Sequence, residues 1–387
     1  MDYFFAQIEE RENPQFKGKP VVVCTSTPLS ANPSEEITVV PEEDNNDAYK
    51  RSANPELVEG LGADPKGGKG RGVVSTSNYE ARKYGIKSGM PISKAYQLCP
   101  DAIFLPVNIE LYEKVSKQIM EIVKKYSPKY EIVSLDEAYL DLSNIFHDRE
   151  IISIEKVWRA AEKIGEKLKR EIFEKEKLTC TVGIGPNKVV AKLATESAKP
   201  NGLKVVRSEE VEKFLDPLDV DDLPGIGPKT AKKLRAIGVN KIFELKKLSK
   251  EKLKEMFGKI GEKIWERARG IDEEPVSPEE IIKSIGRQIT FEKDTRDPEL
   301  IFDAFEKLLK EVNKELVETH FSFKTITVIC RYRGFETHTK SKTLEKPSSD
   351  LTTLKNEAKK LLLRFLIENK KLIRLIGIRI SNLKNNL

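Results

Sequence analysis

Two adjacent acids, Asp136 and Glu137, stand in an otherwise apolar stretch that reads SLDEAYLD over residues 134–141. The apolar and β-branched residues around them predict one continuous strand over 130–142. Neighbouring side chains of a strand point to opposite faces, so a buried strand does not ordinarily hold such a pair. A divalent cation would relieve their repulsion, and Mg²⁺ prefers carboxylate oxygens supplemented by water and substrate phosphates. The alternative is an edge strand whose two acids are solvated.

A glycine- and lysine-rich stretch, LPGIGPKTAKKLRAIG over 223–238, has the composition of a phosphate-binding turn. Gly225 and Gly227 permit a tight turn whose backbone N–H groups can face one phosphate, and Lys229 adds positive charge. Two helices joined by such a turn, a helix-hairpin-helix, would bind the phosphates of a DNA backbone without reading bases. An αα-hairpin packed inside a helical domain is the alternative.

The elements that must position these residues are predicted from periodicity. Residues 108–127 and 153–177 each place apolar side chains on one helical face. Short β-branched segments bounded by turn residues predict strands at 20–24, 72–77, 102–107 and 178–185. This mixture predicts an α+β domain in which one antiparallel sheet carries helices on one face.

Residues 208–270 carry the pattern of short helices, and the acidic, proline-containing stretch 270–282 has the composition of a linker. Strand and helix signals then return, which predicts a second α+β domain. Its strands are expected at 284–291, 324–335 and 373–383, and its helices at 300–318 and 353–369.

Positive charge is concentrated in this second domain. Residues 281–387 contain 22 Lys and Arg against 14 Asp and Glu, a net charge of +8, whereas the whole chain has +6. A local positive field attracts a polyanion such as nucleic acid. A solvated lysine-rich surface would have the same composition.

Residues 25–60 depart from the pattern of both domains. They carry eight acids against two basic residues, which predicts a disordered or loosely packed insertion, with a small partner-binding element as the alternative. The chain has no run of ~18 apolar residues and no visible signal peptide, so a cytoplasmic protein without a membrane span is expected. Its four cysteines and three histidines are scattered, which predicts reduced thiols and no zinc site.

SLDEAYLD resembles the palm motif of Y-family DNA polymerases of the DinB or DNA polymerase IV group, most closely the archaeal members. Further matches follow in the family's order and cover nearly all of the chain outside 25–60. They are FFAQIEE (4–10), STSNYEARKYGIKSGMPISKA (75–95), TVGIGPNKVVAKLATESAKPNG (181–202), the thumb hairpin (223–238) and KSIGRQITF (283–291). The resemblance implies an α+β multidomain, right-hand polymerase with palm, fingers, helical helix-hairpin-helix thumb and α+β little finger.

The resemblance also implies domain boundaries and an activity. The palm is expected at 1–3 and 108–197, the fingers at 4–107 with the acidic insertion 25–60, the thumb at 198–269, the linker at 270–282 and the little finger at 283–387. The implied activity is template-directed, low-fidelity translesion DNA synthesis, in which two Mg²⁺ ions assist the addition of dNTPs to a primer 3′-hydroxyl. The implied partners are primer-template DNA and dNTP, with a sliding clamp as an optional partner, and the chain is expected to be a monomer.

Residue roles follow from the same resemblance. Asp136 and Glu137 match the catalytic carboxylates that bind metal, and Phe5 matches a steric gate that excludes a ribose 2′-hydroxyl. The residues that match the triphosphate-binding set are Thr76, Tyr79, Arg82 and Lys188. DNA contacts are expected from Gly225, Gly227 and Lys229 in the thumb and from Lys283, Arg287, Arg331, Arg333, Lys340 and Lys342 in the little finger.

The amino terminus departs from the family pattern. The motif begins with an aspartate that would fall just before Met1, so Met1 would supply the backbone carbonyl that binds metal, and one carboxylate is missing. Three explanations stay open: a true start further upstream, a catalytically impaired DNA-binding homologue, or substitution by Asp2. Asp2 is displaced by two strand residues, ~6–7 Å, from the expected position. The acidic insertion is a second departure, and the absence of a clamp-binding tail after Leu387 is a third.

Overall fold

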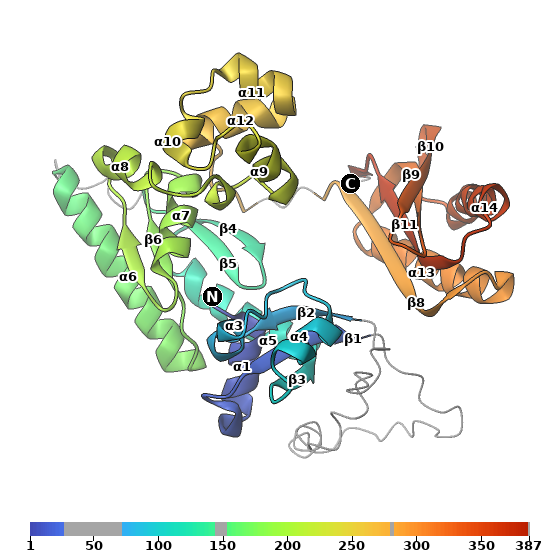
Figure 1. Ribbon diagram of the computed structural model, residues 1–387, viewed down its shortest axis with the longest axis horizontal. Helices are drawn as coiled ribbons and strands as arrows, with labels where there is room; N and C mark the ends of the chain where they lie inside the picture. The colour runs from blue at the N-terminus through green and yellow to red at the C-terminus, as the bar shows by residue number, and fades with distance from the viewer. Residues whose placement is uncertain (27–71, 144–152, 279–281, 386–387) are drawn as a thin grey trace. The chain divides into compact units, whose positions relative to one another are not determined.

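The computed structural model describes residues 1–26, 72–143, 153–278 and 282–385. Residues 27–60 of the predicted insertion lie outside these ranges. The described residues fall into two units, one before residue 279 and one after residue 281 (Figure 1). All four cysteines are buried free thiols, as predicted. No described helix is both long enough and apolar enough to cross a membrane.

The first unit contains a three-stranded sheet with the order β2-β1-β3. Its strands are β1 (Val21–Ser26), β2 (Gly72–Ser77) and β3 (Ile103–Pro106). β1 runs antiparallel to β2 and parallel to β3. Val21 and Val23 belong to one buried cluster, and Val22 and Cys24 belong to another. Side chains alternate between the faces of a strand, so burial of both faces explains the unbroken apolar run.

Helices supply the partners for both clusters. The first cluster takes side chains from α1 (Phe4–Glu12), α5 (Ile109–Lys124) and α6 (Ile154–Glu176), and the second takes them from α3 (Tyr79–Lys83) and α4 (Ile92–Leu98). The helices predicted at 108–127 and 153–177 are confirmed as α5 and α6. One core joins Phe4 with Tyr112 and Leu168, so it continues across the proposed boundary between fingers and palm, which stays a prediction.

Two strand pairs stand apart from this sheet. β4 (Lys129–Ser134) and β5 (Glu137–Asp141) form an antiparallel hairpin, and β6 (Val182–Ile184) runs parallel to β7 (Leu203–Val205). The prediction of one antiparallel sheet is therefore wrong, because the described strands of this unit form three separate sheets. α7 (Lys188–Ala198) connects β6 to β7 and returns the chain to the end of the pair at which β6 began, so the two strands run parallel.

Short helices follow, as predicted for 208–270. They are α8 (Val211–Leu215), α9 (Pro228–Arg235), α10 (Ile242–Leu245), α11 (Lys250–Phe257) and α12 (Lys259–Ala268). Their buried side chains form one cluster that also includes Val190 of α7, together with Leu234 and Ile264. Residues 271–277 form neither helix nor strand, as expected of a linker.

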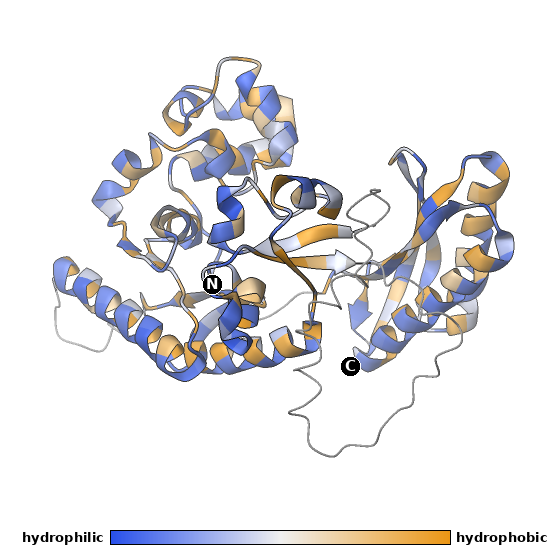
Figure 2. Cartoon of the chain, turned by 60° about the horizontal axis from the view of Figure 1, so that its bottom comes forward, coloured by the Kyte–Doolittle hydropathy of each residue, from blue (hydrophilic) through white to orange (hydrophobic). Residues whose placement is uncertain are grey.

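The second unit is an antiparallel sheet with the order β10-β9-β11-β8. Its elements are β8 (Ser284–Thr295), α13 (Pro298–Glu318), β9 (Phe321–Tyr332), β10 (Thr337–Ser348), α14 (Leu351–Glu368), β11 (Ile373–Ser381) and β12 (Lys384–Asn385), which pairs with β9. Both helices carry a polar and an apolar side, and the apolar side packs with Ile326, Val328 and Ile378 of the sheet (Figure 2).

The predicted strands and helices of this unit are confirmed, and the structure contains one further strand, β10, that was not predicted. Its sequence, THTKSKTLEKPS, contains a single apolar residue, Leu344, so no apolar alternation signals a strand. β10 lies at the edge of the sheet, where lysines and a proline protect against pairing with another chain.

Candidate active site

Asp136 and Glu137 lie at the β4–β5 hairpin, so the prediction of one continuous strand over 130–142 is wrong. The hydroxyl of Ser134 donates to Asp136 Oδ1 at 2.8 Å and accepts from the Asp136 N–H at 3.4 Å. Short side chains that bond to nearby backbone favour turns over continued strand. Ser116 of α5 also donates to the carbonyl of Leu135 at 2.6 Å. These contacts hold the two acids where the chain reverses.

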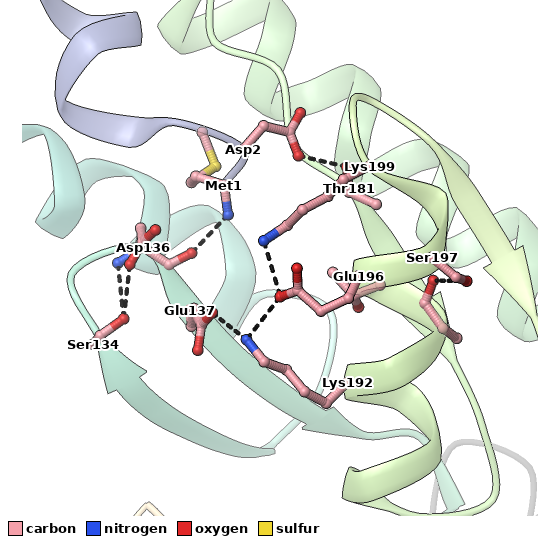
Figure 3. Close-up of polar contacts among 12 residues, drawn as sticks. Met1, Asp2, Ser134, Asp136, Glu137, Thr181, Lys192, Glu196, Ser197 and Lys199 are labelled. Carbon is pink, nitrogen blue, oxygen red and sulfur yellow. Dashed lines mark hydrogen bonds and ion pairs between the residues drawn. The ribbon is translucent and has the colours of Figure 1, made fainter. Parts of the chain in front are cut away.

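Ion pairs along α7 reach Glu137. The ammonium of Lys192 contacts Glu137 and lies 3.1 Å from Glu196, which lies 2.9 Å from Lys199 (Figure 3). Burial lowers the pKa of Lys192, but hydrogen bonds and charge from Glu137 and Glu196 outweigh burial and raise it overall. The amine is therefore charged at neutral pH. The sequence interpretation missed Lys192, although the i+4 spacing from Lys188 to Lys192 and on to Glu196 places all three on one helix face.

The amino terminus lies beside the acid pair. The Met1 ammonium donates to the backbone carbonyl of Asp136 at 2.8 Å. Asp2 is buried, and its Oδ1 accepts from Thr181 Oγ1 at 2.5 Å (Figure 3). Its Oδ2 accepts from the Asn201 N–H at 2.8 Å. Among the described residues, no three acidic, histidine or cysteine side chains gather closely enough to hold a metal. Asp2 therefore anchors the amino terminus and does not join the acid pair.

Lys188 shares a cavity of about 520 Å³ with the acid pair. It begins α7, and Asn187 caps that helix by accepting a hydrogen bond from a backbone N–H at 3.0 Å. The Lys188 amine lies 3.0 Å from the carboxylate of Glu131 on β4. The structure therefore brings a phosphate-binding candidate and the metal-binding candidates together, although their segments are distant in the sequence.

Asn78, which the sequence interpretation missed, positions Tyr79 and Arg82. It is buried, and its Oδ1 accepts from backbone N–H groups at the start of β1 and in α3, at 3.0 and 2.9 Å. Its Nδ2 donates to Glu10 Oε1 at 2.6 Å and to the carbonyl of Lys19 at 2.7 Å. One amide thus ties α1, β1 and the N-terminus of α3 together, which sets where the next residues of α3 lie.

Tyr79 and Arg82 form a pair of their own. The Arg82 guanidinium lies 4.7 Å above the centre of the Tyr79 ring, and its Nε donates to the carbonyl of Ser77 at 3.0 Å. Tyr79 also meets Tyr3 edge-on at 5.3 Å. Burial, and then the charge of Asp2, raise the pKa of Tyr79. Tyr79 is thus electrostatically coupled to the amino-terminal side of the site, but neither Tyr79 nor Arg82 lines the cavity.

Phe5 and Thr76 lie outside the cavity as well. Phe5 stacks on Tyr112, with ring centroids 4.2 Å apart and an interplanar angle of 15°. Thr76 is half-buried on β2, opposite Val23 of β1. Of the predicted nucleotide-binding residues, only Lys188 therefore lines the cavity together with the acid pair.

The predicted helix-hairpin-helix turn is present. Gly225 has φ +98°, a conformation that is easy for glycine and strained for other residues, and Gly227 is the N-cap of α9. Arg267 of α12 donates to the carbonyl of Pro224 at 3.1 Å and fastens the turn. Gly225, Gly227 and Lys229 are exposed, so the first N–H groups of α9 are open to an anion.

The candidate DNA-binding residues of the second unit fall on both faces of its sheet. Arg287 and Lys340 point toward the helices, where each pairs with a carboxylate at 2.6 Å. Lys342 shares that face, because the neighbouring strand places buried Ile326 opposite it. Lys283 precedes β8 and Arg333 follows β9, and both are exposed.

The opposite, open face of this sheet carries hydroxyl groups and two arginines. Arg331 donates to Thr337 Oγ1 at 2.7 Å. Arg379, which the sequence interpretation missed, is exposed between two buried isoleucines of β11 and therefore points to the open face. Cross-strand hydroxyl pairs join Thr325 to Thr343 at 3.1 Å and Thr327 to Ser341 at 2.9 Å.

Comparisons with known proteins cover nearly the whole chain. The impB/mucB/samB family model matches residues 1–196, the model of that family's C-terminal domain matches 282–386, and the thumb-domain model of DNA polymerase-iota matches 221–272. DNA polymerase IV 2 of Methanosarcina mazei is 40% identical over 384 residues, which are 99% of this chain and 91% of the relative. DNA polymerase IV of Sulfurisphaera tokodaii is 38% identical over 383 residues, 99% of this chain and 94% of the relative.

Solved structures agree with these relatives. A Y-family DNA polymerase chimera, Dbh-Dpo4(243-245)-Dbh, superposes with a TM-score of 0.79 at 33% identity and covers 100% of this chain and 98% of its own. The fold and these matches define a DNA-directed DNA polymerase with a helix-hairpin-helix thumb. Within that class, the chain belongs to the Y family, in its DinB or DNA polymerase IV group.

Proposed function

We propose that this chain adds dNTPs to a primer 3′-hydroxyl along a DNA template, with low fidelity and across lesions. The observation that carries the proposal is the shared cavity, which Asp136, Glu137 and Lys188 line together. Carboxylates that bind cations and a lysine that binds phosphate are the groups that phosphoryl transfer requires.

Mg²⁺ is the cofactor that this donor set fits. Asp136 and Glu137 offer carboxylate oxygens, and Met1, whose amine reaches Asp136, offers a main-chain carbonyl. Mg²⁺ commonly takes one or two protein carboxylates and completes its shell with water and substrate phosphates. Two bound Mg²⁺ ions would supply neutralisation of the triphosphate charge and a more acidic primer hydroxyl.

The chain's own side chains would bind and orient the nucleotide. Lys188 would leave its ion pair with Glu131 of β4 and bind the triphosphate. Arg82 would bind phosphate oxygens from the side of Tyr79. Thr76 would add a hydroxyl donor. Phe5, held by an aromatic stack, would lie against the sugar and exclude a ribose 2′-hydroxyl.

Primer-template DNA would bind at two surfaces that read no bases. The turn from Gly225 to Lys229 offers backbone N–H groups and positive charge to one phosphate. The open sheet face of the second unit offers Arg331 and Arg379 among hydroxyl groups, with Lys283 and Arg333 at strand ends. Contacts of this kind make binding salt-dependent.

Primer extension by the full chain tests the proposal. Asp136→Asn should lower extension by about 10²-fold or more, because charge stabilisation at the reacting phosphate is lost. Primer-template affinity, measured by fluorescence anisotropy, should stay within about twofold. Asp101→Asn makes the same charge change at an exposed turn outside the cavity lining and should preserve extension. Full extension by Asp136→Asn would refute the metal assignment.

A catalytically impaired DNA-binding homologue is the second candidate. The ion pair between Lys192 and Glu137 favours it, because a fixed ammonium already neutralises one of the two carboxylates. In that case the unmodified chain would bind primer-template DNA with a normal salt dependence and extend no primer at any Mg²⁺ concentration.

A further inference from the structure

Lys169 of α6 joins two other segments of the chain. Its ammonium donates to the carbonyl of Cys180 at 2.5 Å, to the carbonyl of Asn201 at 2.9 Å and to Asn201 Oδ1 at 2.8 Å. An ammonium has three N–H donors, so all of them are used. The acceptors are uncharged oxygens, so these contacts do not neutralise an acid. They instead connect α6 to the residues that lead into β6 and to the residues that lead into β7.

Residues 199–202, which follow α7 directly, form a tightly fixed loop. Asn201 has φ +49°, a left-handed conformation that asparagine adopts more easily than most residues. A Cβ on Gly202 would lie 2.1 Å from the carbonyl oxygen of Ala198, so only glycine lets the chain pass this close to the end of α7. The Gly202 carbonyl also accepts from the Val182 N–H at 3.1 Å. Contacts with α6, α7 and β6 therefore fix the conformation of this loop.

The loop places an ammonium group in the cavity of the acid pair. Lys199 lines that cavity, and its amine lies 2.9 Å from Glu196 near the end of α7 (Figure 3). Lys169 itself lies outside the lining. Its effect on a ligand would therefore pass through Asn201, which is two residues from Lys199.

We propose that Lys169 is a positioning residue for a triphosphate in this cavity: its three hydrogen bonds fix the loop at 199–202 so that the Lys199 ammonium stays in the cavity. The inference deepens the proposed function and rests on it for the identity of the ligand. A lysine loses rotamer freedom when it binds phosphate, and a main chain that is already ordered adds no further cost. Without the Lys169 ammonium, the loop would have to be ordered at the moment of binding.

Binding of inorganic tripolyphosphate to the full chain, measured by isothermal titration calorimetry at a fixed Mg²⁺ concentration, tests the proposal. Lys199→Met should weaken binding about tenfold, because a charged hydrogen bond to phosphate is lost. Lys169→Met should weaken it about fivefold, because the loosened loop must be ordered on binding. Lys167→Met removes the same charge from an exposed position of α6 outside the lining and should change the affinity by less than about twofold.

A double-mutant cycle separates positioning from a general loss of structure. If Lys169 acts by placing Lys199, the double variant with both Lys169→Met and Lys199→Met should bind within about twofold of Lys199→Met alone. Independent effects would multiply to a loss of about 50-fold relative to the unmodified chain. In primer extension, Lys169→Met should raise the KM for dNTP about fivefold and leave kcat within about twofold, as expected when only nucleotide binding changes.

Asn201→Gly provides a second variant in case circular dichroism melting shows that Lys169→Met does not fold. It removes the Oδ1 acceptor of Lys169, and glycine adopts the positive φ without strain. Because one of the three hydrogen bonds is lost, tripolyphosphate binding should weaken about two- to threefold.

Unchanged tripolyphosphate affinity in a folded Lys169→Met variant would overturn the proposal, as would unchanged affinity in Asn201→Gly if Lys169→Met does not fold. Independent losses in the double variant, a lower kcat with unchanged KM, or no tripolyphosphate binding by the unmodified chain would overturn it as well. If the unmodified chain bound tripolyphosphate with the predicted variant effects but extended no primer, the proposed function would fail and the positioning role of Lys169 would stand.

Discussion

Lys192 of α7 and Glu137 of β5 form an ion pair, although they are 55 residues apart in the sequence. Lys192 also lies 3.1 Å from Glu196, so its ammonium bridges two carboxylates. A cation that belongs to the chain thus stands beside one of the two candidate metal ligands. Any divalent ion that binds Glu137 must compete with this ammonium.

Removal of the Lys192 charge should therefore strengthen metal binding. Lys192→Gln is expected to lower the dissociation constant for Mg²⁺ by about two- to fivefold, because a partly exposed ion pair is worth up to about 1 kcal/mol. Isothermal titration with Mg²⁺ measures the change. Lys199→Gln removes a partner of Glu196 without touching Glu137 and should have little effect. Unchanged Mg²⁺ affinity in Lys192→Gln would exclude this competition.

Asn78 should contribute more to the free energy of unfolding than an ordinary helix cap does. Asn78→Ala removes hydrogen bonds to three elements in a buried position, so the free energy of unfolding should fall by about 2–4 kcal/mol. Asn108→Ala removes a single cap contact, to the Leu111 N–H at 3.2 Å, and should cost about 1 kcal/mol. Urea unfolding followed by circular dichroism measures both, and equal losses would contradict the tying role of Asn78.

Glu9 should make stability fall as pH rises. It is 6% exposed, and burial raises its pKa even though Tyr112 donates to it at 2.6 Å. A group whose folded pKa exceeds the unfolded value stabilises at low pH and loses that contribution as pH rises through the folded pKa. Glu9→Gln keeps an acceptor for Tyr112 without a titrating charge. Its melting temperature should exceed that of the unmodified chain at pH 8.

The gain in melting temperature from Glu9→Gln should shrink toward zero at pH 4, where the wild-type carboxyl is protonated and, like the Gln amide, carries no charge. Thermal melts at pH 4, 6 and 8 measure this trend. Glu113→Gln, at an exposed position of α5, is the control and should show no such trend. A gain that is the same at all three pH values would show that titration of Glu9 is not its cause.

The two sheet faces of the second unit should differ in DNA binding. Arg331→Ala and Arg379→Ala, on the open face, should each reduce the slope of log affinity against log salt by about one. Arg287→Ala should change it less, because Arg287 already pairs with Glu315 on the helix side at 2.6 Å. Anisotropy titrations between low and moderate salt provide the slopes, and equal slopes for all three variants would contradict docking by the open face.

Much of the local structure could be predicted from the sequence. Apolar periodicity located α5, α6, α13 and α14, and the two glycines of 223–238 located the turn before α9. The motif around Asp136 indicated the polymerase family. These signals are readable because helix periodicity, turn chemistry and motifs act over a few neighbouring residues.

Tertiary structure alone decided which distant groups meet. It broke the expected strand into a hairpin at Asp136, put Lys192 beside Glu137, and left β5 and β6 in separate sheets. It also turned Arg287 and Arg331 to opposite faces of one sheet. Strand pairing and ion pairing depend on which distant segments come together and in which register, and local residue patterns do not determine this.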